Sequence, residues 1–165
     1  MLKDVKNFKN TTIDWGRTQG DIIKLLEIRG IKETRFTNIS YETATRAGIL
    51  MEEDTGAIML EFMKPITLDG GVGGILPIKI IIPNIPNDEK LRKQAYRIFW
   101  HYLKNKFIGI DSGLIEFEQE FMPHIAIGKG GGAGTMWQAF KQKMLPKIIS
   151  GENSNINLLE SPKDK

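Results

Sequence analysis

The residues of this sequence that could do chemistry are cations set among apolar side chains in segments with strand-like alternation. Arg35 and Lys79 both lie in such segments. Because side chains alternate between the two faces of a strand, we expect both cations on the face opposite Phe36, Ile78 and Ile80. Cations beside apolar groups suit single-stranded nucleic acid, since they neutralise phosphates while bases rest on apolar surface.

The same periodicity predicts a whole outer sheet face of mixed apolar and basic character. The side chains expected to point inward, toward the helices, are Ile58, Leu60, Phe62, Ile78, Ile80 and Ile82. The outer face would then carry Arg35, Thr37, Met59, Glu61, Met63, Lys79 and Ile81. Methionine and isoleucine on an open sheet indicate a covered surface, such as a homo-oligomer face, a protein-partner site or a platform for bases. The alternative is that the chain itself, over residues 125–140, folds across this face.

Two other places offer candidate contacts. Trp15 stands beside Arg17 outside any strong element, which makes it a candidate exposed aromatic. The glycine-rich loop Gly128–Gly134 contains Lys129 and precedes a helix, whose free N–H groups could meet a phosphate. A Walker loop has its lysine at the end rather than the start, so a hinge or linker is the favoured interpretation of this loop.

No catalytic constellation is visible. Glu116, Glu118 and Glu120 lack a partner base, and His101 and His124 stand far apart in the sequence. The chain contains no cysteine, which excludes disulfides and thiolate metal sites. We therefore predict a protein that is not an enzyme and that uses no metal and no cofactor.

The elements that must position these residues follow from hydrophobic spacing. A long helix over residues 87–108, with Asn87 as N-cap, carries apolar residues three and four apart. A helix capped by Thr18 and Asp21 stops at Gly30, and another opens with a Thr135–Gln138 capping box. The segments predicted as strands are 11–14, 32–39, 49–52, 57–63 and 76–82, with a hairpin turn at Glu53–Gly56 and a flexible loop at Gly70–Gly74. This order predicts an α+β, two-layer fold in which an antiparallel sheet of about four strands packs against the long helix and shorter helices.

Length and composition favour one domain over residues 1–149, with a frayed basic arm at 1–10 and a disordered tail at 150–165. Of the 165 residues, 41% are hydrophobic and 26% charged, the balance of a globular protein. The net charge of +3 permits a polyanionic partner without requiring one. With no apolar run of membrane-spanning length and no signal-like start, we expect a soluble cytoplasmic protein that does not contact a membrane.

Three sequence blocks resemble a group of small phage and prophage proteins in which a helix precedes a hairpin-rich sheet and a long helix. These blocks are Thr18–Ile31, TQGDIIKLLEIRGI, Gln94–Lys104, QAYRIFWHYLK, and Phe121–Ile125, FMPHI. The element order is also similar to the ThermoDBP type of single-stranded DNA-binding protein, a sheet backed by helices. The resemblance implies a phage-type protein of the host-cell cytoplasm but no activity. Our leading hypothesis is a single-stranded nucleic-acid-binding protein, and the alternative is an oligomeric phage accessory or host-defence-modulating protein that binds protein partners.

Overall fold

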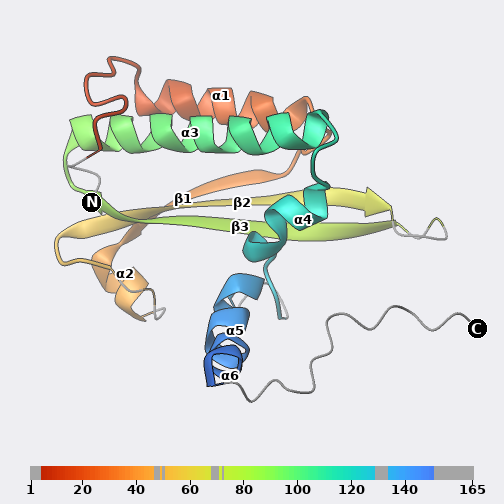
Figure 1. Cartoon of the computed structure of the whole chain (residues 1–165). Helices are drawn as coiled ribbons and strands as arrows, with labels where there is room; N and C mark the ends of the chain where they lie inside the picture. Colours follow the sequence, from red (N-terminus) through yellow and green to blue (C-terminus); the bar gives the residue numbers. More distant parts are fainter. Residues whose placement is uncertain are drawn as a thin grey trace, which may run out of the picture.

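A three-stranded antiparallel sheet and two long helices form the body of the molecule (Figure 1). The computed structural model describes residues 5–46, 49, 51–67, 71, 73–128 and 134–150. The strands, in the spatial order β1–β2–β3, are β1 (Thr34–Ser40), β2 (Thr55–Thr67) and β3 (Gly73–Pro86). The fold is therefore α+β with an antiparallel sheet, as predicted, but the sheet has three strands rather than four.

The helices divide between the two sides of this sheet. Helices α1 (Trp15–Glu27) and α3 (Glu89–Asp111) lie side by side on one face and run in the same direction. Helices α2 (Tyr41–Arg46), α5 (Met136–Lys143) and α6 (Leu145–Ser150) lie on the other side (Figure 1). Helix α4 (Phe117–Phe121) and the 3-10 turn η2 (Met122–His124) connect the two sides.

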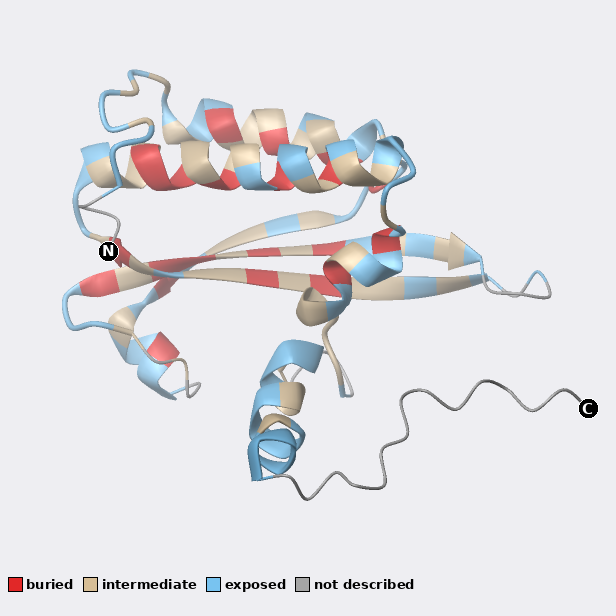
Figure 2. Cartoon of the chain, in the orientation of Figure 1, coloured by how far each residue is buried: buried red, intermediate tan, exposed pale blue. Residues whose placement is uncertain are grey.

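The core lies between α3 and the inner sheet face (Figure 2). Helix α3 contributes Phe99, Leu103 and Phe107, and all three are buried. They pack with residues of the sheet, of α1 and of α4, namely Ile22, Leu26, Leu60, Phe62, Ile78, Ile80, Phe117 and Phe121. The predicted inward positions of β2 and β3 are therefore correct, and the long helix is the main wall of the core.

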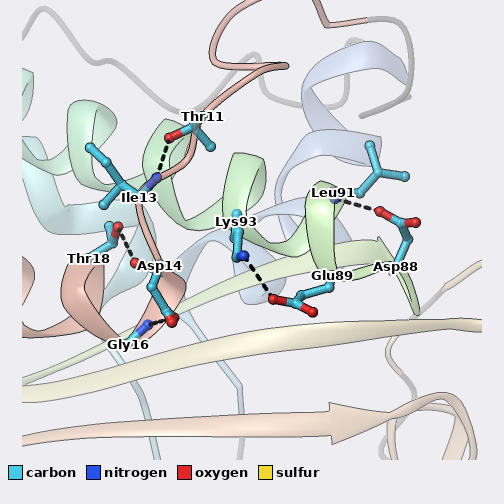
Figure 3. A network of polar contacts seen from close by, with 9 residues as sticks. All are labelled: Thr11, Ile13, Asp14, Gly16, Thr18, Asp88, Glu89, Leu91 and Lys93. Atoms are coloured by element: carbon cyan, nitrogen blue, oxygen red, sulfur yellow. Dashed lines mark hydrogen bonds and ion pairs between the residues drawn. The ribbon is translucent and has the colours of Figure 1, made fainter.

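The helix starts differ from the prediction, as Figure 3 shows. Asp14, not Thr18, is the N-cap of α1, and its carboxylate accepts a hydrogen bond from Gly16 N at 3.1 Å. Thr18 is buried inside the helix and donates to the Asp14 carbonyl. In α3 the N-cap is Asp88 rather than Asn87, and it accepts from Leu91 N at 2.8 Å. Both caps place a carboxylate at a helix N-terminus, which the helix dipole favours.

Two of the predicted strands are absent from the described residues. The segment 11–14 leads into the Asp14 cap instead of pairing with a strand. The predicted hairpin around Glu53–Gly56 is also wrong, because residues 51–52 are not in a strand and β2 pairs instead with β1, Arg35 opposite Glu61. Ile49 and Met51 lie in a loop and pack against the buried cluster of Ile39, Ala44 and Ala57.

Prolines mark the positions where strands have no neighbour. The Pro77 carbonyl accepts from Ala126 N, so the odd-numbered residues of β3 direct their backbone groups away from β2. Pro83 lies in the register shift between the Ile58–Ile82 and Gly56–Ile85 pairs and has no partner in β2. Pro65 in β2 lies beyond Phe62, where the pairing with β1 stops. At each of these three positions the missing N–H of proline costs no hydrogen bond, because no adjacent strand offers an acceptor.

The first described residues are not a frayed arm. The amide nitrogen of Gln94 on α3 donates to the carbonyls of Val5 and Asn7, at 2.7 and 2.8 Å. The ring of Phe8 stacks on that of His101, with centroids 4.4 Å apart. Residues 5–10 therefore lie against α3. Their carbonyls accept the hydrogen bonds that the buried amide of Gln94 needs. The predicted tail, 150–165, lies outside the described residues except for Ser150, which ends α6.

Replacing Leu103 by Ala tests the core assignment. Leu103 is fully buried, so the substitution should lower the free energy of unfolding by about 2–5 kcal/mol through lost burial and a cavity. Ile108→Ala on the same helix is the matched control, and with half of its side-chain surface exposed it should cost less than about 1 kcal/mol. Urea denaturation measures both, and equal losses would contradict the assignment.

Candidate functional site

The outer sheet face carries a row of three charges, one from each strand. The β-sheet register places Arg35 opposite Glu61 and Glu61 opposite Lys79. Arg35 Nε donates to Glu61 Oε2 at 2.8 Å, which makes this a cross-strand ion pair. The two predicted cations are therefore on the predicted face, but a carboxylate lies between them and the row has a net charge of +1.

The apolar residues of the outer face are only partly covered. Met59 and Ile81 pack beside the cluster of Ile39, Ala44 and Ala57, which α2 helps to form. Met63 keeps 41% of its surface exposed. Of residues 125–140, which were predicted as a possible cover for this face, Ile125 and Ala126 pair along the β3 edge rather than across the face. Part of the face thus stays open beside Arg35 and Lys79.

Two other predicted contact residues lie on α1 and not on the outer face. Trp15 is the first residue of α1 and is half-buried, because it packs on the inner side with its ring 5.9 Å from that of Tyr96. The prediction of an exposed aromatic at this position is therefore wrong. Arg17 follows on the same helix and is exposed. Lys129 lies outside the described residues.

The helix start after the glycine-rich loop is already capped. Thr135 and Gln138 form the predicted capping box, with Thr135 N donating to Gln138 Oε1 at 2.8 Å. Met136 N donates to the Ile125 carbonyl. Gly134 has φ 95°, and an added Cβ would lie 2.4 Å from Gln138 Oε1, so glycine is required there. Since these N–H groups are engaged within the chain, the start of α5 offers little to a phosphate.

A basic, acid-free stretch that the sequence analysis did not single out forms α5 and α6. Residues 121–151 contain no aspartate or glutamate, and Lys141, Lys143 and Lys147 are all exposed. Among the described residues, none of these lysines is in an ion pair. Trp137 is half-exposed and stacks on Phe140 with ring centroids 5.7 Å apart. The absence of acids over this long run was the signal that could have identified it.

On the helical side some basic residues are paired with acids, whereas Arg17, Lys24, Lys90 and Lys104 are exposed and, among the described residues, are in no ion pair. Arg29 pairs with Asp111, Arg97 with Asp21, and Lys93 with Glu89. Arg97 also lies over the Trp100 ring, 4.4 Å from its centroid. Exposed cations that could meet a polyanion therefore occur on both sides of the sheet, and Lys141, Lys143 and Lys147 are those of α5 and α6.

A polar cluster joins α3 to η2. Tyr102 Oη lies 3.0 Å from His124 Nε2, and Lys106 pairs with Glu120 beside them. Burial and the nearby Lys106 charge lower the pKa of His124, which favours the neutral form of the ring. Burial alone would lower the pKa of Lys106, but its hydrogen bonds to Glu120 and Tyr102 outweigh this and raise it. No group of three or more histidines and carboxylates within the described part of the chain is arranged to hold a metal ion.

The class of protein that these observations define is a three-stranded α+β domain with a half-covered sheet face and an adjoining basic helix pair. Comparison with protein-family models, with curated proteins and with solved structures finds no match. The resemblance to phage proteins and to the ThermoDBP type therefore stays a prediction. Within the described residues, no helix has both the length and the apolar character needed to cross a membrane.

The histidines predict a pH dependence of stability. Burial lowers the pKa of both His124 and His101 below the usual value of 6.5. The unfolded chain therefore binds more protons than the folded chain just below that pH, and stability falls as the pH drops from about 7 toward 5. His124→Gln should reduce this slope in urea titrations across pH. An NMR pKa above 6.5 for the His124 ring would contradict the assignment.

Proposed function

We propose that this chain binds single-stranded nucleic acid on the side of the sheet formed by the outer face and α5–α6. The observation that carries the proposal is the Trp137–Phe140 stack beside exposed lysines in a stretch without acids. Aromatic rings stack on bases of any sequence, and lysines neutralise phosphates without reading sequence. The protein would act in the cytoplasm as a binding protein and not as an enzyme.

The open part of the outer sheet face extends this surface. The register places Lys79 and the partly exposed Met63 on the outer face, and Figure 1 shows that α5 and α6 lie on this side of the sheet. Bases could rest on Met59, Met63 and Ile81 while Lys79 meets a phosphate. Arg35 contributes less than its charge suggests, because Glu61 already binds its guanidinium.

Replacing Trp137 by Ala tests the stacking contact. Loss of a base–aromatic stack costs about 1–3 kcal/mol, so affinity for an unstructured oligonucleotide should fall about 5- to 150-fold. Because α5 has no buried residue, the melting temperature should not change. Leu114→Ala removes another highly exposed apolar side chain, at the end of α3, and should leave affinity unchanged. Fluorescence anisotropy with labelled oligo(dT) makes the measurement, and unchanged binding by the Trp137 variant would refute the stacking role.

Replacing Glu61 by Gln tests the outer face through an expected gain of affinity rather than a loss. Removing the carboxylate frees Arg35 for a phosphate, so affinity should rise and the log–log salt slope should steepen by about 0.7 for one added contact. Glu27→Gln, an equal change of charge on exposed α1 in the other layer, is the matched control and should give a smaller gain. If both variants bind alike, the outer face is not part of the contact surface, whereas the proposal for α5 would still stand on Trp137.

A second candidate is a protein-interaction module. The observation in its favour is the row of exposed apolar side chains on α5 and α6, which are Met136, Met144, Ile148 and Ile149. Methionine-rich helical surfaces adapt to partner grooves, and a second copy of the chain would give a homo-oligomer. Under this alternative, the wild-type protein sediments as a dimer or larger, Trp137→Ala shifts it toward monomer, and no salt-dependent binding of oligo(dT) is seen.

A further inference from the structure

A pocket of about 530 Å³ lies between α3 and the β3 edge, away from Trp137 and the α5–α6 lysines. Its walls are aliphatic and aromatic side chains, among them Ile82, Ile85, Ile98 and Phe99, and Val5 from the N-terminal segment closes one side. None of its lining residues carries a charge. Its volume falls in the usual range for small-molecule sites, which combine apolar walls with a few placed polar groups.

Of the polar residues that line this pocket, Asn84 already accepts a hydrogen bond from Glu52 N, and the other two lie together in one place. Tyr102 and His124 line it there and contact each other, Oη to Nε2, at 3.0 Å. Tyr102 also borders a second hollow of about 300 Å³, lined by Asn105, Lys106 and Glu120. Tyr102 therefore borders both hollows, of which the first has mainly apolar walls and the second mainly polar ones.

The chemistry of the second hollow restricts the polar end of a ligand. Lys106 and Glu120 neutralise each other, and Asn105 offers both a donor and an acceptor. A free carboxylate would meet Glu120, and a free ammonium would meet Lys106. A neutral group that both donates and accepts hydrogen bonds, such as a hydroxyl or an amide, satisfies all three residues.

We propose that this pocket binds a small neutral amphiphile, with an acyl or aromatic body against Ile98 and Phe99 and a hydroxyl- or amide-bearing head at Tyr102. A bound body would remove exposed apolar surface from water along the edge of β3, the driving force for such sites. The site is independent of nucleic-acid binding, since it shares only Ile81 with the outer sheet face.

The test uses the full chain and the neutral fluorophore N-phenyl-1-naphthylamine, displaced by 1-decanoylglycerol or by decanoate. We expect saturable fluorescence at about micromolar concentrations, with the glyceride displacing the probe at concentrations about tenfold lower than decanoate does. Tyr102→Phe should weaken binding of the glyceride but not of the probe, because it removes the head-group contact and leaves the apolar walls intact.

Two pocket-filling variants make the result specific. Ile98→Trp should abolish probe binding, whereas Ile108→Trp, the same substitution at an exposed position of α3, should not. Val5→Trp fills the pocket from a segment outside the helices and strands, so it stays informative if the Ile98 variant fails to fold. The proposal is overturned by an absence of saturable binding, by undiminished binding in Val5→Trp, or by decanoate competing as well as the glyceride.

Discussion

Burial of the inner face of β2 is the constraint on which the rest of the structure depends. As the central strand, β2 has a strand neighbour on each side over Ile58–Phe62. Its inner side chains can therefore be covered only by an element that packs on the inner face of the sheet. Helix α3 does this with Phe99 and Leu103, and removing such a contact would cost several kcal/mol of a total stability that is itself small. Helix α1 is then fixed against α3, with Gln19 donating to the Tyr96 hydroxyl at 2.7 Å.

The opposite face of the same strand shows how an open sheet is kept polar without like-charge repulsion. Glu61 lies between Arg35 and Lys79, so neighbouring strands present opposite charges to each other. The row on the sheet therefore carries only a small excess charge, and Lys141, Lys143 and Lys147 are exposed on the helices on the same side of the sheet. A search of the strands alone finds the charged outer face but passes over these helices.

Local patterns predicted the elements whose stability is itself local in origin. The spacing of Phe99, Leu103 and Phe107 identified α3, and the Thr135–Gln138 capping box was found at its predicted place. The sheet pairing was harder, because the apolar run of residues 49–51 resembles a strand while the partner of β2 is chosen by long-range packing. The start of α1 is set by the Asp14 cap, a local signal that was passed over in favour of Thr18 and Asp21.

Contacts between side chains that are distant in the sequence could not be predicted from it. His101 and His124 looked isolated, yet η2 brings His124 onto Tyr102 and the N-terminal segment brings Phe8 onto His101. The ion pair between Arg35 and Glu61 likewise needed the β1–β2 register, which a one-residue shift would have destroyed. For the basic helix pair the signal was present, but it was an absence of acids rather than a motif, and a search for motifs passes over it.

The β3 edge limits how copies of this chain could associate through their sheets. Pro77 faces the free edge of β3, and Ile125 and Ala126 already occupy part of that edge, so a strand from another molecule cannot form a continuous ladder there. Within the described part of the chain, the outer edge of β1 pairs with no other strand. A molecule with one usable edge can join a second copy edge to edge in a closed two-fold dimer, but it cannot then add further copies through its sheet. Sheet-mediated growth of this protein into open filaments is thereby blocked after a single step.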